Sequence, residues 1–151
     1  MSNDSKRGYQ GIFFDEETSK KLEELQQNQL ESPVQDMHIT FKFGELEEYP
    51  DELMGKYIEV TLIGYGCDGK NSGFEVELPA DVEAKFYKGN RPIHITVSIG
   101  TVNGKKAKPV DTAKLHFEPL TDPVTVSGRF GYFVFGEVKI FFDNSIFHKD
   151  D

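Results

Sequence analysis

MHITFKF at residues 37–43 and IHITVSIG at residues 93–100 are the two stretches that decide the fold. Polar and apolar side chains alternate in both, and a period of two residues predicts a β-strand with one buried face. The expected polar faces are formed by His38, Thr40 and Lys42 in the first strand and by His94, Thr96 and Ser98 in the second. The expected apolar faces are formed by Ile39, Phe41 and Phe43, and by Ile93, Ile95, Val97 and Ile99. The two strands are therefore built alike.

The segment before the first of these strands favours a strand followed by a helix. Residues 9–14 are apolar and aromatic, which indicates a strand. Residues 15–30 (DEETSKKLEELQQNQL) begin with acids and carry leucines at helical spacing, so they predict a helix that ends before Pro33.

The rest of the chain favours further strands and one short helix. Residues 57–65 and 74–78 predict a hairpin joined by the turn GCDGKNSG, and residues 79–87 predict a short helix with a proline at its start. Residues 124–142 predict aromatic-rich strands. We expect these strands to break into hairpins at three glycines, Gly128, Gly131 and Gly136. The order of elements predicts an α+β fold with antiparallel sheets and flanking helices.

Length, charge and cysteine usage narrow the class of protein. The chain of 151 residues has the length of one domain, which we place at residues 9–147, between polar ends at residues 1–8 and 148–151. The one cysteine, Cys67, allows neither an intramolecular disulfide nor a zinc site made of cysteines. We expect no membrane span and no secretory leader, and hence a cytoplasmic protein. The net charge of −9 argues against double-stranded DNA as a partner.

The two His-Ile-Thr tripeptides are the candidate site. Residues i and i+2 of a strand point the same way, about 7 Å apart, so an imidazole and a hydroxyl can converge on one small group. If the two strands face each other across a cleft, one histidine can accept a proton from an attacking oxygen and the other can give one to the leaving oxygen. We therefore expect His38, Thr40, His94 and Thr96 to cleave a phosphodiester without a metal or another cofactor, with the threonines donating to the phosphate oxygens. Which histidine is the acid is open at this point.

The motifs HITF, residues 38–41, and HITV, residues 94–97, resemble the two H-x-[ST]-h motifs, in which h is hydrophobic, of the 2H phosphoesterase superfamily. The opening stretch YQGIFFDEETSKKLEELQ, residues 9–26, is also similar to this family. The resemblance implies a bilobal fold in which the two motifs lie on strands that line a central cleft between the lobes. It also implies metal-independent cleavage of RNA-type phosphodiesters.

Within this superfamily, the small size and the tract PIHITVSIGTVNGKKAKPVDTAKL, residues 92–115, are most similar to phage-encoded phosphodiesterases that degrade the cyclic oligonucleotide signals of bacterial CBASS immunity. This narrower resemblance implies cleavage of 3′-5′ bonds in cyclic di- and trinucleotides, in the cytoplasm of the host cell. Other branches imply the alternatives of opening 2′,3′-cyclic phosphates or cleaving 2′-5′ linked RNA in RNA end processing. A non-catalytic protein that sequesters cyclic nucleotides is an alternative from a different class.

Three further residues are candidates for holding the substrate. Tyr9 and Phe13 alternate at the start of the domain and can stack on a nucleobase, with core packing as the alternative for each. Lys106 belongs to the local lysine cluster that follows the second motif and can attract a polyanionic ligand, with a solvated loop as the alternative. The expected partner is thus a small ribonucleotide, bound by a monomer or a weak oligomer.

Overall fold

The computed structural model describes residues 6–26, 30–34, 37–88, 92–137 and 139–147, which form a mixed α+β fold. Eight strands form one antiparallel sheet in the order β2-β6-β5-β4-β9-β1-β3, with β10 paired to β9, and β7 and β8 form a separate two-stranded sheet. The prediction of an α+β fold built on antiparallel strands is therefore confirmed. Residues 1–5 and 148–151 of the two predicted polar ends lie outside the described residues.

The strands that matter for the candidate site are β1 (Arg7–Phe13), β3 (His38–Glu45), β5 (Asn71–Glu77), β6 (His94–Ile99) and β9 (Glu118–Val134). The other strands are β2 (Ser32–Pro33), β4 (Tyr57–Cys67), β7 (Thr101–Val102), β8 (Lys105–Lys106) and β10 (Ile140–Phe141). The helices are α1 (Glu16–Leu25) and α2 (Ala80–Phe86), and three 3-10 turns follow: η1 (Asp51–Leu53), η2 (Pro109–Lys114) and η3 (Ser145–Phe147). Neither described helix is long and apolar enough to cross a membrane.

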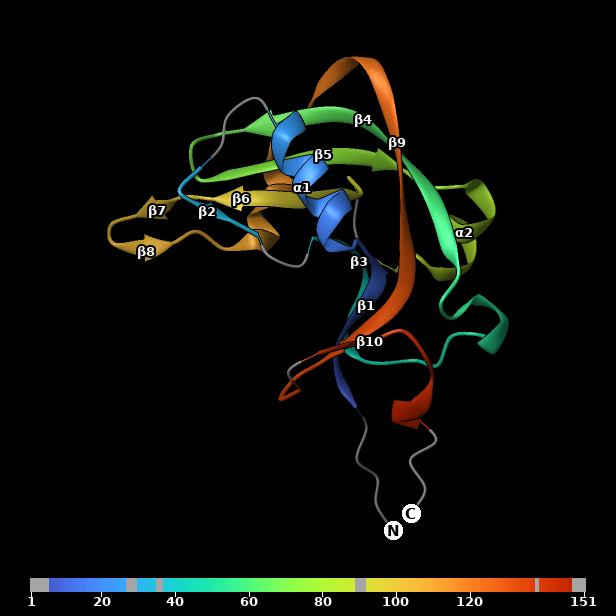
Figure 1. The fold of residues 1–151 in the computed structure, drawn as a ribbon. Helices are drawn as coiled ribbons and strands as arrows, with labels where there is room; N and C mark the ends of the chain where they lie inside the picture. The colour runs from blue at the N-terminus through green and yellow to red at the C-terminus, as the bar shows by residue number, and fades with distance from the viewer. Residues whose placement is uncertain (1–5, 27–29, 35–36, 89–91, 138, 148–151) are drawn as a thin grey trace.

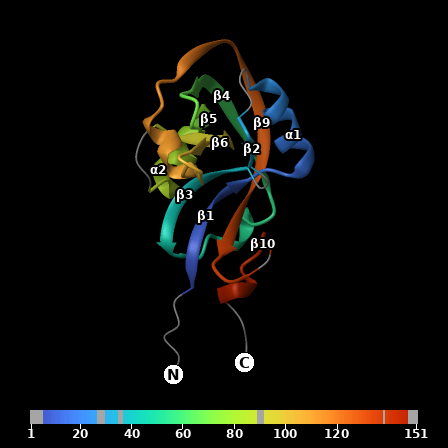
Figure 2. The same cartoon turned by 90° about the vertical axis from the view of Figure 1, so that its left-hand side faces the viewer.

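The eight-stranded sheet curls until its two ends approach each other. β2 and β3 follow one another in the chain but lie at opposite ends of the strand order, and β3 contacts β6. The backbone N–H of Val34 donates to the carbonyl of Val97 at 2.8 Å, whereas Met37 accepts from the N–H of Phe14 at 3.0 Å. The chain thus changes its partner from β6 to β1 between β2 and β3, and the sheet is nearly closed (Figure 2). This closure makes the strands of the two motifs neighbours.

Helix α1 lies across β5 and β6 (Figure 1) and is shorter than the sequence predicts. The side chain of Asp15 caps its first turn by accepting from the backbone N–H of Thr18 at 2.8 Å, and this bond lowers the pKa of Asp15. The helix ends at Leu25 because Gln26 takes an extended backbone and buries its side chain. Its Oε1 accepts from the hydroxyls of Ser72 and Ser98. Residues 27–29 of the predicted helix lie outside the described residues.

Strand β9 runs unbroken through Gly128 and Gly131, so the hairpin breaks predicted there are wrong. Gly128 allows close packing between strands and does not form a turn. A Cβ on Gly128 would lie 2.5 Å from Cγ2 of Ile12 and 2.9 Å from the carbonyl oxygen of Phe13. Gly136, in contrast, has a φ of +92° and lies in the turn between β9 and β10, as predicted.

Candidate active site

The first motif places one imidazole and one hydroxyl on the outer face of the sheet. His38 is the first residue of β3 and lies opposite Phe13 of β1, and Thr40 lies opposite Gly11. Both motif side chains are half-buried, whereas Ile39, which lies between them, is 1% exposed and packs in the core. This part of the predicted alternation is confirmed.

A bulge after Thr40 reverses the positions that follow it. The pairing of β1 with β3 shifts after Gln10, so Lys42 lies opposite the buried Gln10, and Phe43 lies opposite Tyr9. The prediction for these two residues is therefore wrong. Lys42 does not share the face of Thr40, and Phe43, which is 70% exposed, is not part of the core.

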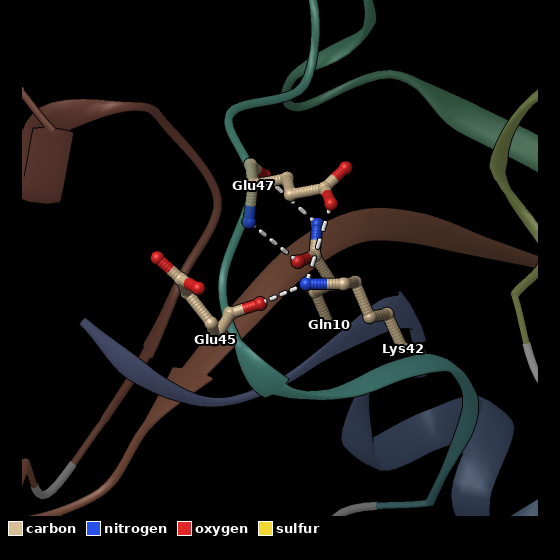
Figure 3. Close-up of polar contacts among 4 residues, drawn as sticks. All are labelled: Gln10, Lys42, Glu45 and Glu47. Atoms are coloured by element: carbon tan, nitrogen blue, oxygen red, sulfur yellow. Dashed lines mark hydrogen bonds and ion pairs between the residues drawn. The ribbon is translucent and has the colours of Figure 1, made fainter. Parts of the chain in front are cut away.

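Lys42 instead fixes the chain that leaves β3 (Figure 3). Its ammonium lies 3.4 Å from the carboxylate of Glu47 and also donates to the carbonyl of Glu45. Gln10 binds the backbone of Glu47 twice, since its Nε2 donates to the carbonyl at 2.9 Å and its Oε1 accepts from the N–H at 2.8 Å. Lys42 therefore has a structural role on the side of the sheet opposite to Thr40.

The second motif repeats the arrangement of the first. His94 is the first residue of β6 and lies opposite Glu75 of β5, and Thr96 lies opposite Gly73. Both motif side chains are again half-buried, and Ile95 between them is fully buried. The two motifs therefore present their histidines and threonines in the same way, each on a strand whose other face fills the core.

Ser98 departs from the predicted polar face for the same reason as Lys42. The pairing of β5 with β6 shifts between Ser72 and Gly73, and Ser98 lies opposite Ser72. Because Ser72 and Gly73 are consecutive in a strand, they point to opposite sides, and Ser98 therefore points away from the face of Thr96. It is fully buried and donates to Oε1 of Gln26 at 2.8 Å.

A glycine opposite each threonine lets the neighbouring strand approach closely. A Cβ on Gly11 would lie 1.9 Å from the carbonyl oxygen of Ile39, and a Cβ on Gly73 would lie 2.4 Å from that of Ile95. Only glycine fits at such distances. Each half of the site thus combines a strand with a glycine, a His-Ile-Thr strand and a bulge directly after the threonine. The HIT repeat can be found in the sequence alone. The position of a glycine opposite each threonine, and the bulge after it, can be seen only in the structure.

The surroundings of His94 favour a neutral imidazole with one defined tautomer. Its Nδ1 lies 3.0 Å from the carbonyl oxygen of Pro92, and because a carbonyl only accepts, Nδ1 carries the proton. The lone pair is therefore on Nε2. Burial lowers the pKa of His94 below its ordinary value of 6.5, although the bond to Pro92 opposes that shift.

Thr96 is held by a residue that the sequence does not single out. Its hydroxyl donates to Oγ1 of Thr112 at 2.8 Å, and Thr112 also accepts from Nδ2 of Asn71 at 3.2 Å. Thr112 is fully buried on η2, which packs against β5 and β6. No motif marks Thr112, since η2 reaches β6 only in the folded chain.

His38 lies among aromatic rings. Its ring stacks on Tyr9 with 4.6 Å between the centroids and on Phe13 with 5.3 Å. Phe13 is buried, with 2% of its surface exposed, and packs against the His38 ring, whereas Tyr9 is half-buried. The structure thus brings two of the three predicted substrate-binding residues together with the first motif. The third, Lys106, is exposed on β8, outside the eight-stranded sheet that carries both motifs.

The motifs lie on strands that contact each other. Two open pockets of the described residues lie elsewhere: one of about 150 Å³ is lined in part by Lys42 and Lys88, and one of about 470 Å³ in part by Cys67 and His116. His38 and His94 line neither of these, and the predicted cleft between the motifs stays a prediction. Residues 35–36 and 89–91, which precede the motifs, lie outside the described residues.

No group of three or more His, Cys, Asp or Glu side chains within the described ranges is arranged to hold a metal ion. The chain matches no model of a known protein family and no curated protein. What the site does must therefore be argued from its own residues.

Proposed function

We propose that the protein is a phosphodiesterase of the 2H type that cleaves a small ribonucleotide by acid–base catalysis with two histidines. The observation that carries the proposal is the duplicated half-site: two contacting strands each present a histidine and a threonine beside a glycine and ahead of a bulge. In this proposal the two strand sets are the two lobes of a 2H fold. The preferred substrates are cyclic di- and trinucleotide signals in the cytoplasm of a host cell, cleaved by a monomer or weak oligomer.

The reaction requires a base, an acid and donors for the phosphate. The base takes the proton of a ribose 2′-hydroxyl, and that oxygen forms a bond to the adjacent phosphorus. The bond from phosphorus to O5′ breaks, and the acid gives a proton to O5′. A 2′,3′-cyclic phosphate and a 5′-hydroxyl result, so a cyclic oligonucleotide becomes linear. Thr40 stabilises the charge on the non-bridging oxygens, and Thr96 does so once its hydroxyl turns from Thr112 to the phosphate.

The different surroundings of the histidines support different roles. His94 suits the base, because its Nδ1 proton is bound to the Pro92 carbonyl and Nε2 keeps a lone pair. His38 suits the acid, because the face of the Tyr9 ring attracts a cation that lies over it.

The test is an incubation of the protein, with EDTA present, with cyclic di- and trinucleotides and with 2′,3′-cyclic nucleotides, followed by mass spectrometry of the products. We expect linear products from the cyclic oligonucleotides and no cleavage of their 2′-deoxy analogues. The variants His38→Gln and His94→Gln should each abolish turnover and keep ligand binding. His116→Gln is the matched control, because His116 is exposed beside Glu118 and should leave turnover unchanged.

The alternatives give distinct results in the same assay. Turnover of 2′,3′-cyclic nucleotides alone, with a monoester as product, would assign the protein to RNA end processing. Recovery of intact cyclic oligonucleotide from a tight complex would indicate sequestration. Full activity of either histidine variant would exclude the two-histidine mechanism, and loss of activity in EDTA would indicate a metal enzyme.

A further inference from the structure

We infer that Thr112 and Asn71 are positioning residues for Thr96. They form a chain of hydrogen bonds that keeps the oxygen of Thr96 in place while its proton turns from Thr112 to the phosphate. The inference rests on the proposed function, because it gives these residues a role in the same reaction. Neither residue touches the substrate, and both act through the hydroxyl of Thr96.

Asn71, the first residue of β5, holds η2 against the sheet. Its amide nitrogen donates to the carbonyl of Lys108, the N-cap of η2, at 2.9 Å and to Oγ1 of Thr112 at 3.2 Å. A carbonyl only accepts, so the nitrogen of this amide, and not its oxygen, faces η2. The backbone N–H of Asn71 donates to the carboxylate of Asp68 at 2.8 Å, which fixes the turn before β5. Asn71 is fully buried, so water does not compete for its side-chain bonds.

Two paired glycines allow η2 and the chain after it to approach the outer face of the sheet. A Cβ on Gly73 would lie 2.7 Å from Cγ2 of Thr112. Gly66 pairs with Gly73 across β4 and β5, and its Cβ would lie 2.8 Å from the carbonyl oxygen of His116. Because Gly73 is also the residue opposite Thr96, this close approach brings Thr112 to the second motif.

The hydroxyl of Thr112 suits both directions of the Thr96 proton. A threonine oxygen has one proton to donate and two lone pairs that accept. The amide of Asn71 occupies one lone pair of Thr112, which leaves the other lone pair and the proton for Thr96. In the free protein Thr112 accepts from Thr96 at 2.8 Å. When Thr96 donates to a phosphate oxygen, Thr112 donates to Thr96 instead.

This reversal keeps the oxygen of Thr96 hydrogen-bonded throughout, since only the two hydroxyl protons rotate. Donors that are already in place lower a barrier most, because little has to be reordered during the reaction. A role in which Thr112 merely withdraws the Thr96 proton from the phosphate has the opposite sign. Loss of the Thr112 hydroxyl would then speed the reaction, whereas a positioning role predicts that it slows the reaction.

The test compares kcat and KM for a cyclic dinucleotide in Thr112→Val and Thr112→Ser. Valine keeps the shape of threonine but has no hydroxyl. We expect Thr112→Val to lower kcat roughly threefold to tenfold, the range for one neutral hydrogen bond, and to leave KM nearly the same, because the bond contributes most as charge develops. Thr112→Ser keeps the hydroxyl and should restore most of kcat.

Ser72→Ala is the matched control for the loss of a buried hydroxyl. Ser72 is also fully buried on β5, and its hydroxyl donates to Oε1 of Gln26 at 3.1 Å. It precedes Gly73 and therefore points to the other side of the sheet. Like Thr112→Val, it should lower the free energy of unfolding in urea, but kcat of the folded protein should not change.

A double variant tests whether Thr112 acts through Thr96. In a Thr96→Ala background, Thr112→Val should cause no further fall in kcat, because the hydroxyl that it positions is absent. The rotamer of Thr96 is a readout that needs no turnover. Three-bond couplings from its methyl carbon to its backbone nitrogen and carbonyl carbon should show one rotamer in the wild type and averaging in Thr112→Val.

The outcomes separate this inference from the proposed function. Averaged couplings in Thr112→Val support the positioning of Thr96 even if the wild type cleaves no ribonucleotide, a result that would reject the proposed function. If the wild type is active, the inference is overturned when Thr112→Val is as fast as the wild type or faster. An equal fall in kcat in the Thr96→Ala background, or unchanged couplings, overturns it as well, while the two-histidine mechanism stands.

Discussion

The two histidines have the same sequence neighbours but different surroundings, and the difference sets a pH dependence. Burial lowers the pKa of His94 below 6.5, so its neutral form is present at neutral pH. If His94 is the base, the acidic side of the kcat/KM profile falls below pH 6.5, where the imidazole takes up a proton. We expect the acidic limb of a kcat/KM profile for a cyclic dinucleotide to have its midpoint below 6.5. A midpoint at or above 6.5 would assign the base to another residue.

The lowered pKa of His94 also makes the stability of the fold depend on pH, and this effect can be measured without a substrate. The unfolded chain binds a proton at His94 at a higher pH than the folded chain does. The contribution of His94 to folding is therefore complete above 6.5 and is lost as the pH falls through its lower pKa. His94→Gln should remove this part of the pH dependence in urea unfolding, whereas the exposed control His116→Gln should not.

At the scale of the residue, the sequence predicts which side chains are candidates but not all of their neighbours. The alternation of His38, Ile39 and Thr40 is enough to assign a face to each of them, because it depends only on the period of a strand. Thr112 lies 16 residues from its partner Thr96, and no local pattern connects them. Contacts of this kind depend on how η2 folds back, which short-range periodicity does not determine.

At the scale of the element, both motif strands depend on a glycine in the adjacent strand. A Cβ on Gly11 or Gly73 would collide with a backbone carbonyl at 1.9 or 2.4 Å, and backbone cannot move aside as a side chain can. We expect Gly11→Ala and Gly73→Ala each to lower the free energy of unfolding by about 3 kcal/mol, the upper end for overpacking. Each should also reduce turnover more than the loss of folded protein explains, because the motif backbone must shift.

Gly64→Ala is the matched control for these variants. Gly64 also lies in a central strand, but its Cβ would meet its nearest neighbours at 3.2 Å, which a small adjustment can accommodate. Urea unfolding followed by circular dichroism measures all three. Equal destabilisation of the three variants would mean that the close approach has no special importance at the motifs.

The elements also show where periodicity stops being informative. An alternating pattern predicts strands at the two motifs, and strands are found there. The same pattern places Lys42 and Ser98 on the wrong faces, because one inserted residue in each strand shifts the alternation. Gly128 and Gly131 are predicted to end strands, but β9 continues through both. The sequence does not distinguish a glycine that allows close packing from one that forms a turn. Bulges and close approaches are properties of strand pairs, so they cannot be predicted from the sequence of one strand.

At the scale of the whole molecule, one buried hydrogen-bond network ties distant parts of the chain together. The hydroxyl of Tyr132 accepts from the backbone N–H of Tyr49 at 2.7 Å and donates to Oδ1 of Asn144 at 2.5 Å. Nδ2 of Asn144 donates in turn to the carbonyl of Tyr49 at 2.8 Å and to the carboxylate of Asp51 at 2.6 Å. The network connects β9, the segment before η1 and the segment before η3, which lie far apart in the sequence. It therefore fixes these two segments against β9, the strand that pairs with β1.

Removal of the Tyr132 hydroxyl should weaken the attachment of these segments to β9. Tyr132→Phe leaves a buried N–H and a buried amide oxygen without a partner, and we expect a loss of about 2 to 3 kcal/mol in the free energy of unfolding. Tyr57→Phe, which removes an exposed hydroxyl, should change it by less than about 0.5 kcal/mol. Burial raises the pKa of Tyr132 to about 12, so the unfolded chain ionises first and the wild type loses stability as the pH rises from 10 toward 12. The Phe variant should lose less over that range. Equal pH dependence of the two proteins, or an unaltered unfolding midpoint in urea, would mean that the network does not stabilise the folded chain.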